Sequence, residues 1–483
     1  MGITFVLVRK KKEAPLLENV LIEDYAAEGK SLARVNGKVI FVEGAVPGDV
    51  VDVQLQKNKA DWGEGFVKKF HTYSSIRVKP FCTHFGVCGG CQWQMLPYEQ
   101  QLVYKHKQVF DNLTRIAKVA LPTIPPILGA KETQWYRNKV EYTFATEKFI
   151  PFEEFKAMKA AGLEPVKSIG AGGFHARGFF EKVVEIDTCY LQSEPTNEIR
   201  KTAVQFAIEN EMPFYNIKQH QGWLRNMFVR NTTKGEWMVN IILGYDGGEK
   251  REALLNLFLK KFPQITTLLY TINEKRNDSM QDLVPQVYFG NGYITESLEN
   301  FDFKISPKSF FQTNSKQAES LYQVTRSFAE LTGKEVVYDL YCGTGSIGIF
   351  CSQEAKKIIG VEVVADAIED AKENARINNL TQTAFFAGDV IDICDDAFFD
   401  THGKPDVIIT DPPRAGMHDK LVKKLLEIQA PLIVYVSCNP ATQARDLSLL
   451  GEKYTVTKIQ PVDMFPHTLH IENVVQLKRT DLL

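Results

Sequence analysis

The fold of this chain is constrained most by the regular alternation of short apolar runs and amphipathic stretches between residue 306 and residue 483. The apolar runs have the length of strands, and the stretches between them have the periodicity of helices. This order is typical of a doubly wound parallel sheet with helices on both faces, an α/β fold. The predicted strands read EVVYDLY, IIGVEVV, FFAGDV, DVIITDPP and LIVYVSC, and the predicted helices include ADAIEDAKENARINN and KLVKKLLEI.

Polar or reactive side chains stand at or just past the ends of the predicted strands. They are Asp339, Glu362, Asp389, Asp411 and Cys438. Ligands of such sheets bind at the carboxyl ends of the strands, so these side chains are expected to converge on one edge. Each carboxylate alone could be a helix N-cap, but chance is a poor explanation for their presence at successive strand ends.

A glycine-rich loop follows the first predicted strand of this region. Its sequence, DLYCGTGSIG, places Gly343, Gly345 and Gly348 in the G-x-G-x-x-G spacing, which lets the backbone approach a nucleotide. Glu362 ends the next strand, where a carboxylate can accept hydrogen bonds from both ribose hydroxyls. These features fit NAD and S-adenosylmethionine equally, so an NAD-dependent oxidoreductase is one interpretation.

Two acidic positions distinguish the cofactors. Asp339 directly precedes the glycine loop, where it could meet the cationic groups of S-adenosylmethionine. Asp411 begins an Asp-Pro-Pro segment at the end of the fourth strand, and this rigid segment suits a wall between a methyl donor and a flat base. A dehydrogenase has no evident need of such a wall. The sequence therefore favours methyl transfer from S-adenosylmethionine.

The cysteines are unevenly distributed along the chain. Cys82, Cys88 and Cys91 have the spacing C-x5-C-x2-C, and Cys189 could supply a fourth thiolate. In an intracellular protein such clustering indicates metal or redox chemistry rather than disulfides, and zinc accepts four cysteine ligands. Cys438 is either a packing residue, which is the commoner role of a buried cysteine, or a nucleophile at the mouth of its strand.

The N-terminal part of the chain has a different pattern. Residues 17–73 alternate apolar and polar positions, with turns at Asn36-Gly37 and Pro47-Gly48, which predicts a small β-barrel. Residues 57–80 then mix lysines and arginines with Trp62, Phe66, Phe70 and Tyr73. Basic groups interleaved with aromatic rings suit single-stranded or looped RNA, although a solvated barrel edge would look the same.

Between these regions the pattern is mixed. We expect a helix over residues 97–119 and strands in YRNKVEYTF, FVRNTTKGEWMVNIIL and TTLLYTIN, but the sequence predicts no topology for them. A chain of 483 residues with 44% hydrophobic content is too long for one core. We therefore expect three domains: residues 1–80, a β-barrel; residues 81–305, a mixed α+β domain; and residues 306–483, the α/β domain.

Charge and hydropathy limit the binding partners and the cellular location that can be expected for this protein. The formal net charge of −2 argues against a generic nucleic-acid coat protein, and no apolar run reaches the length of a membrane helix. The first residues, MGITFVLVRKKKE, put the apolar stretch before the basic cluster, the reverse of a signal peptide. A cytoplasmic protein without membrane contact is expected.

The motifs together resemble a known family. DLYCGTG, GVE, DPPRAG, SCNP and the late HIEN are similar to those of the RNA uracil-5-methyltransferases, and the best match is to the bacterial 23S ribosomal RNA branch. The resemblance implies an N-terminal TRAM barrel that binds RNA, an iron–sulfur middle domain and a C-terminal class I, Rossmann-like methyltransferase domain. It also implies a cytoplasmic enzyme, expected to be a monomer, that methylates structured RNA.

The resemblance also assigns roles to single residues. Cys438 is the nucleophile that adds to carbon 6 of uracil, and Glu472 is the base that removes the proton from carbon 5. Without the resemblance, Glu472 would fit an ordinary surface charge on a strand. The cofactor-binding set is Gln312, Asp339, Tyr341, Gly343, Gly345, Ser346, Glu362, Asp389 and Asp411. Cys82, Cys88, Cys91 and Cys189 are the ligands of a four-iron four-sulfur cluster, with zinc as the alternative.

Several alternatives stay open at this point. RNA cytosine-5 methyltransferases commonly carry a second cysteine near the Asp-Pro-Pro segment, whereas Arg414 follows the prolines here, which favours uracil. A tRNA T-loop uracil methyltransferase is the nearest alternative, but typical bacterial examples lack the barrel and the cysteines. An RNA-binding scaffold with an inactive catalytic domain is a third interpretation, and the presence of both Cys438 and Glu472 argues against it.

Overall fold

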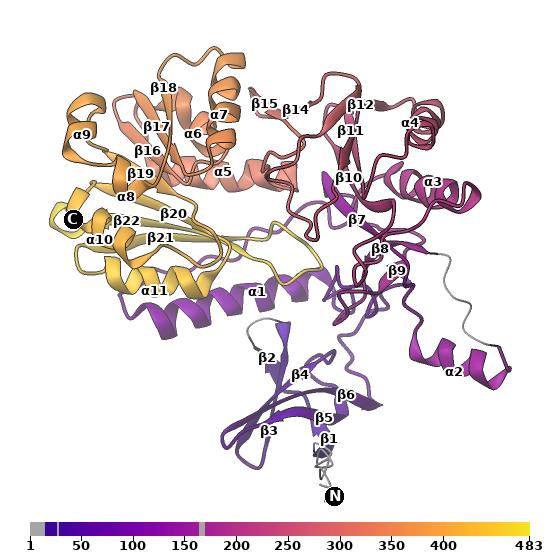
Figure 1. Cartoon of the computed structure of the whole chain (residues 1–483). Helices are drawn as coiled ribbons and strands as arrows, with labels where there is room; N and C mark the ends of the chain where they lie inside the picture. Colours follow the sequence, from indigo (N-terminus) through magenta and orange to yellow (C-terminus); the bar gives the residue numbers. More distant parts are fainter. Residues whose placement is uncertain (1–14, 27–28, 164–169) are drawn as a thin grey trace, which may run out of the picture. The chain divides into compact units, whose positions relative to one another are not determined.

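The structure is a computed structural model that describes residues 15–26, 29–163 and 170–483 (Figure 1). The first residues, on which the expectation of no signal peptide rests, lie outside the described part. The chain forms two compact units, of which the first comprises residues 1–81 and 92–104 and the second residues 82–91 and 105–483. In the described ranges, no helix is both long and apolar enough to cross a membrane.

The first unit is built on a six-stranded sheet with the order β1-β5-β6-β4-β3-β2. The Asn36-Gly37 turn joins β3 to β4 with φ angles of 51° and 78°, as a tight hairpin requires. Val42, Val51 and Val53 are fully buried in its core. The predicted strands of residues 17–73 are therefore present. They are β1 (Leu16–Leu21), β2 (Asp24–Tyr25), β3 (Ser31–Val35), β4 (Lys38–Glu43), β5 (Val50–Asn58) and β6 (Trp62–Thr72).

The second unit contains a seven-stranded sheet, here called the middle sheet, whose order is β13-β12-β11-β10-β7-β8-β9. Neighbouring strands are antiparallel except β11 and β12, which are parallel. Its strands are β7 (Lys139–Ala145), β8 (Ala171–His175), β9 (Val183–Glu185), β10 (Leu224–Asn231), β11 (Trp237–Leu243), β12 (Ile265–Ile272) and β13 (Gln286–Phe289).

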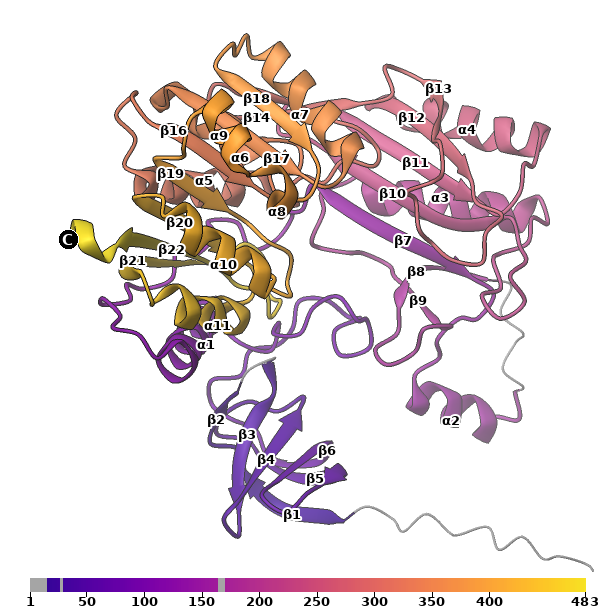
Figure 2. The same ribbon diagram turned by 60° about the vertical axis from the view of Figure 1, so that its left-hand side comes forward.

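Two helices, α3 (Thr196–Glu209) and α4 (Glu249–Lys261), cover one face of the middle sheet (Figure 2). Tyr142, Met227 and Phe258 lie in the core between them. Because side chains alternate along a strand, the opposite face carries Lys139, Glu141 and their neighbours. The predicted helix of residues 97–119 is also present, as α1 (Tyr98–Asn112) and a π-helical turn (Leu113–Ala117). A helix α2 (Phe152–Ala160) and a hairpin of β14 (Ile294–Leu298) and β15 (Phe301–Ile305) complete this part.

A second seven-stranded sheet, the catalytic sheet, has the order β18-β17-β16-β19-β20-β22-β21. The five predicted strands are present and parallel, and two further strands pair antiparallel at one edge. Counted along the chain the order is 3-2-1-4-5-7-6. The strands are β16 (Val336–Leu340), β17 (Lys357–Glu362), β18 (Thr383–Ala387), β19 (Val407–Thr410), β20 (Leu432–Ser437), β21 (Tyr454–Val462) and β22 (Glu472–Arg479).

Helices pack on both faces of the catalytic sheet, as predicted. On one face, Leu321 of α5, Ile349 of α6 and Ile368 of α7 join the main core. On the other, Tyr338 of β16 contacts the rings of α9, and Tyr435 of β20 donates a hydrogen bond to Asp446 of α11. The helices are α5 (Ser315–Ala329), α6 (Ser346–Cys351), α7 (Ala365–Ile377), α8 (Val390–Ile393), α9 (Asp396–His402), α10 (Asp419–Ile428) and α11 (Pro440–Leu450).

Candidate active site

The glycine loop between β16 and α6 is held in a conformation that few residue types adopt. Tyr341, Gly343 and Gly345 have φ angles of 61°, 53° and 76°. A Cβ atom on Gly345 would lie 2.9 Å from the ring of Phe385, so glycine is needed there for packing. A Cβ atom on Gly343 would meet nothing within 4 Å, which leaves this side of the loop open to a ligand.

Glu362 and Asp389 lie beside this loop. The carboxylate of Glu362 accepts hydrogen bonds from the backbone N–H groups of Gly343 (3.2 Å) and Val364 (3.0 Å). Val363, the next residue, has an exposed fraction of 66%, which provides an apolar surface next to the carboxylate. Asp389 caps α8 by accepting from the N–H of Ile391, so its interpretation as an N-cap is also correct.

Asp339 is buried, and only one of its two carboxylate oxygens accepts a hydrogen bond in the described structure. Its Oδ2 accepts a hydrogen bond from the N–H of Gly348 at 2.9 Å, while its buried Oδ1 has no hydrogen-bond partner in the described structure. Burial raises the pKa of this carboxyl to about 7, and the charges of Asp411 and Glu362 add to the effect. A cation bound here would relieve both the repulsion and the missing contact. The donor set therefore fits S-adenosylmethionine, whose sulfonium and amino groups are cationic.

Two further members of the predicted cofactor set lie close to the loop. The hydroxyl of Ser346 is 2.9 Å from the hydroxyl of Tyr322 on α5. Gln312 is buried just before α5, and its backbone carbonyl accepts a hydrogen bond from Asn138 at 2.9 Å. Phe310 has an exposed fraction of 69%, and its carbonyl is 3.4 Å from the hydroxyl of Thr344 in the glycine loop.

Cys438 follows β20, as predicted. Burial, helped by the charges of Glu472 and Asp411 and opposed by Arg414, raises the pKa of its thiol to about 12. The turn after it is rigid: Asn439 caps α11 by accepting from the N–H of Ala441, and its side chain donates to the carbonyl of Arg414 at 3.0 Å. The SCNP turn and the DPPR segment are thus tied together.

Glu472 is the first residue of β22, and only 5% of it is exposed. The alternative of a surface charge is therefore wrong. Burial raises the pKa of Glu472 well above its usual value, and the charge of Asp411 raises it further, against the lowering effect of Arg414. Burial also raises the pKa of Asp411, to about 7. Two carboxyls, a thiol and one guanidinium thus share a site at the carboxyl edge of the catalytic sheet.

The segment before Glu472, residues 463–471, is held by side chains that no sequence motif had marked as functional. Lys105 and Asp463 form an ion pair of 2.6 Å between two fully buried side chains. Lys105 also donates to the carbonyl of Phe465, and Tyr136 donates to that of Pro466. No sequence motif marks these residues, because the partners are more than 300 positions apart.

Three of the four candidate cysteine ligands lie around one small apolar core, and the fourth, Cys82, is close enough for its charge to raise the pKa of Cys88 and Cys189. Cys189 is buried in it beside Tyr136, and Cys88 and Cys91 pack against it, as does Phe465. Burial raises the pKa of Cys88 to about 11, with smaller effects from the charges of Cys189 and Cys82. Within residues 15–26, 29–163 and 170–483, however, no group of three or more His, Cys, Asp or Glu side chains is arranged to hold a metal ion. The donor set suits a metal, but a metal centre stays a prediction.

Exposed aromatic and basic side chains lie together on strand β6 of the first unit. Trp62, Phe66, Lys68 and Lys69 are all exposed there. Phe70 and Tyr73 stack on one another, and the guanidinium of Arg77 lies over Phe70 at 5.0 Å. This mixture fits the stacking and phosphate contacts of unpaired RNA.

Comparison with known proteins agrees with this geometry. Residues 396–480 match the tRNA (Uracil-5-)-methyltransferase family, residues 323–431 the methyltransferase small domain, and residues 18–67 the TRAM domain. An uncharacterized RNA methyltransferase of Bacteroides thetaiotaomicron is 50% identical over 94% of this chain and 99% of its own length. One of Porphyromonas gingivalis is 46% identical over 95% and 99%.

Among solved structures, the tRNA (uracil-54, C5)-methyltransferase of Pyrococcus abyssi in complex with S-adenosyl-L-homocysteine is similar to this chain. The TM-score is 0.71 at 27% identity, over 95% of this chain and 99% of that one. The fold and the site define a methyltransferase of the S-adenosylmethionine-binding class. The chain belongs to the RNA uracil-5-methyltransferase family.

Proposed function

We propose that this protein transfers a methyl group from S-adenosylmethionine to carbon 5 of a uridine in 23S ribosomal RNA, through a covalent bond between Cys438 and the base. The observation that carries the proposal is the grouping of Cys438, Glu472 and Asp411 at the edge of the catalytic sheet, close enough for their charges to shift one another's pKa values. Uracil carbon 5 is a weak nucleophile, and this group supplies what is needed to activate it.

The protein's residues divide the work as follows. The Cys438 thiolate forms a bond to carbon 6 of the ring, which makes carbon 5 nucleophilic. S-adenosylmethionine, when bound, supplies the electrophilic methyl group. A carboxylate, assigned to Glu472, then takes the proton from carbon 5, and the electron pair of that C–H bond reforms the ring double bond and expels the thiolate. The buried position of Glu472 holds it in place for this second step.

The raised pKa of Cys438 has a mechanistic consequence. With the pKa near 12, the thiol is neutral at pH 7 in the protein alone, which protects it from oxidation and alkylation. Arg414 already lowers this pKa in the protein alone, so further positive charge must enter before a thiolate can form, and the sulfonium of the bound donor supplies it.

The residues proposed to hold the donor occupy one side of the glycine loop. Glu362 accepts from the ribose hydroxyls, Asp339 faces the cationic groups, and the open side of Gly343 admits the backbone of the ligand. The complete proposed set is Gln312, Asp339, Tyr341, Gly343, Gly345, Ser346, Glu362, Asp389 and Asp411. Titration with S-adenosylmethionine and, separately, with NAD tests it, and preferential binding of NAD would contradict it.

The RNA target has two candidates. The motif set and the cysteines favour 23S ribosomal RNA, whereas the similar solved structure is named as a tRNA (uracil-54, C5)-methyltransferase, which favours the tRNA T-loop. Mapping 5-methyluridine in ribosomal and transfer RNA from a deletion strain decides between them. Loss of the modification from transfer RNA alone would overturn the ribosomal assignment.

We also propose that Cys82, Cys88, Cys91 and Cys189 hold a four-iron four-sulfur cluster, with one thiolate for each iron. The core shared by Cys88, Cys91 and Cys189 and the charge effect of Cys82 on Cys88 support this, and packing of the core against Phe465 would stiffen the segment before Glu472. Equal amounts of iron and acid-labile sulfide in anaerobically purified protein are expected. One zinc ion without sulfide would replace the cluster with a zinc site. We propose a cytoplasmic monomer whose domains are residues 1–80, 81–305 and 306–483.

A further inference from the structure

A cavity of about 630 Å³ lies at one end of the middle sheet, among residues outside the proposed catalytic and cofactor-binding set. Its walls come from the residues that follow β7, β11 and β12 and from those that precede β10. These four segments meet at one end of the sheet because β10 runs antiparallel to β7 and β11, while β12 runs parallel to β11. A volume of this size holds a nucleoside.

The lining has a specific chemistry. Three aromatic residues, Phe214, Tyr215 and Tyr245, are combined with four side-chain amides, and no lysine or arginine is found among the described residues of the wall. The wall also contains His220 and Glu274. The exposed ring of Tyr245 and the neutral amides suit a planar heterocycle, whereas a phosphate would need cations and would be repelled by the Glu274 carboxylate. The amides belong to Asn216, Gln219, Gln221 and Asn273.

The walls are built by close backbone contacts. A Cβ atom on Gly222 would lie 2.3 Å from the carbonyl oxygen of Phe214, and one on Gly244 would lie 2.1 Å from that of Gly222. Glycine is therefore required at both positions. Tyr215 is packed beneath the guanidinium of Arg225, 4.2 Å from its ring centroid. Tyr245, by contrast, has an exposed fraction of 39%, so its ring can receive a stacked partner.

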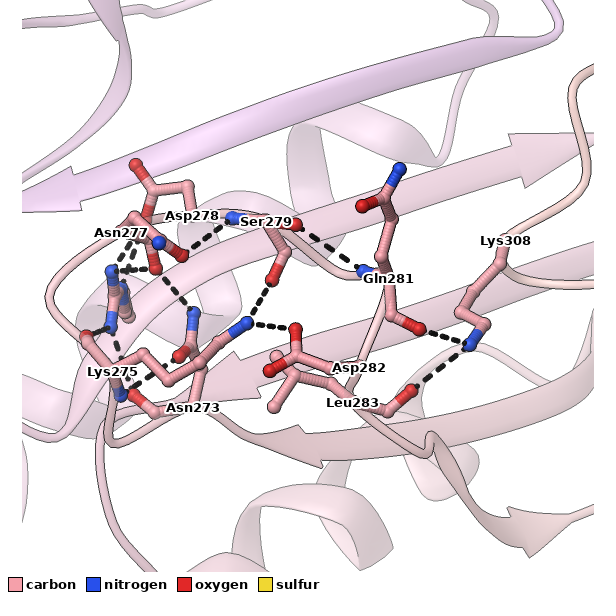
Figure 3. Close-up of polar contacts among 10 residues, drawn as sticks. Asn273, Lys275, Asn277, Asp278, Ser279, Gln281, Asp282, Leu283 and Lys308 are labelled. Carbon is pink, nitrogen blue, oxygen red and sulfur yellow. Dashed lines mark hydrogen bonds and ion pairs between the residues drawn. The ribbon is translucent and has the colours of Figure 1, made fainter. Parts of the chain in front are cut away.

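One loop leads from this cavity to Lys308, on the segment that carries cofactor candidates, and Figure 3 shows the polar contacts of this loop. The loop, residues 273–283, begins with Asn273 in the cavity wall. Arg225 fixes its first half through the carbonyls of Asn273, Lys275 and Asn277 and the carboxylate of Asp278. Within the loop, Lys275 donates to the carbonyl of Ser279 and pairs with Asp282.

The far end of the loop is held from the segment that carries cofactor candidates. Lys308 donates to the carbonyls of Gln281 (2.9 Å) and Leu283 (3.3 Å), as Figure 3 shows. Lys308 stands two residues before the exposed Phe310 and four before Gln312. The same segment is fixed by Arg230 of β10, which donates to the carbonyl of Ser309 at 2.7 Å. A group bound in the cavity is thus linked to the cofactor side by direct contacts.

We propose that this cavity receives a second unpaired nucleobase of the RNA substrate, separate from the uracil that is methylated. The inference rests on the proposed function, in which the target uracil must leave its stack. A loop that releases one base exposes its neighbours as well, and a protein that reads single-stranded RNA binds such bases by stacking and by their edges. Binding of this second base in the cavity sets the position of the RNA strand on the protein. The uracil that this position brings to the catalytic edge is then the one that is methylated.

The test is steady-state methylation of an RNA fragment that contains the mapped target, by the full-length protein and its Tyr245→Ala variant. Loss of one stacked base should raise the KM for RNA about tenfold and leave kcat within about twofold. Gln219→Ala should raise KM less, because one amide is lost and the stack remains. Phe289→Ala, which removes an exposed aromatic ring from β13 outside the cavity, is the matched control and should leave KM unchanged.

A double-mutant cycle that combines the Tyr245→Ala variant with RNA lacking one base shows whether that base occupies the cavity. Removing the correct base from the RNA should raise the wild-type KM by the same factor as Tyr245→Ala, and should have little further effect on that variant. An unchanged KM for Tyr245→Ala, or equal abasic effects on both proteins at every unpaired position, overturns the inference. Failure of the wild-type protein to methylate any RNA would instead refute the proposed function, so the two failures are distinguishable.

Discussion

The two seven-stranded sheets of the second unit place polar side chains in different ways. In the catalytic sheet five strands are parallel, so the carboxyl ends of β16 to β20 all lie on one edge, and Asp339, Glu362, Asp411 and Cys438 gather there. In the middle sheet most neighbours are antiparallel, so its polar groups are divided between the face away from α3 and α4 and a cavity at one end. The first arrangement suits chemistry at one point, and the second suits contact over a long ligand.

This comparison predicts that changes at the catalytic edge abolish turnover and leave binding intact. Cys438→Ala should lower the methylation rate by about 10⁴-fold or more, because no bond to carbon 6 can form. The affinity for S-adenosylmethionine, measured by calorimetry, should be unchanged. Cys394→Ala, at a buried cysteine that follows α8, is the matched control. Substantial turnover by Cys438→Ala would remove it from the nucleophile role.

Glu472→Gln should separate the two halves of the reaction. Turnover should fall by about 10³-fold, since the proton on carbon 5 has no acceptor, while bond formation by Cys438 and methylation proceed. A protein–RNA adduct should therefore accumulate and survive a denaturing gel. The double variant Cys438→Ala/Glu472→Gln should form none. Normal turnover by Glu472→Gln, with no adduct, would assign the base to another residue.

The crowded carboxyls should make the ligand-free protein sensitive to pH. The pKa values of Asp339 and Asp411, about 7 in the folded state, are raised above their unfolded values near 4. Their contribution to stability is thus complete below about pH 4 and is lost as the pH rises through 7. The free energy of unfolding should be roughly 5 kcal/mol lower at pH 8 than at pH 5, because each carboxyl contributes about half of the difference. Urea titrations check this, and Asp411→Asn should reduce the difference; an equal difference in that variant would exclude Asp411 as its source.

The middle sheet should show the smallest effects, and only on RNA binding. Lys139 is partly buried on the face away from α3 and α4, 4.9 Å from the ring of Phe228, and burial followed by the charge of Arg230 lowers its pKa to about 8. Lys139→Met should weaken RNA binding roughly threefold and reduce its salt dependence by about one phosphate contact. Lys260→Met on α4, which covers the other face, is the control. A loss of kcat in Lys139→Met would break the division between the two sheets.

The same difference explains what the sequence could predict. Each parallel strand of the catalytic sheet can be recognised in the sequence as a short apolar run. The residue that ends such a run lies at the carboxyl edge of the sheet, where ligands bind. The positions of Asp339 and Cys438 at this edge could therefore be predicted from the strand pattern alone. Glu472 came from the family motif, because the antiparallel strand β22 carries no such rule. In the middle sheet, the predicted strand pieces of residues 136–144 and 266–273 cover most of β7 and β12, and the piece of residues 228–243 covers the second half of β10 and all of β11, two strands joined by a turn. The order of these strands depends on long-range packing.

Other features depend on contacts that no local pattern encodes. The pairing of Lys105 with Asp463 joins residues 358 positions apart, and the cavity around Tyr245 is made of four separate segments. The cysteines illustrate an intermediate case. Their spacing predicted a group, and the structure places Cys88, Cys91 and Cys189 around one core, whereas the identity of a bound metal depends on the geometry of the four thiolates and not on their spacing.

The buried pair of Lys105 and Asp463 also bears on whether the catalytic half can exist as a module. A fragment of residues 306–483 would contain every strand of the catalytic sheet but would lack the amine that neutralises Asp463, and it would lose the hydroxyl of Tyr136 as well. An unpaired buried carboxylate costs several kcal/mol, a large part of the stability of a domain. During synthesis, residue 105 leaves the ribosome long before residue 463. The segment that carries Glu472 can therefore adopt its working position only in a chain that retains its early residues.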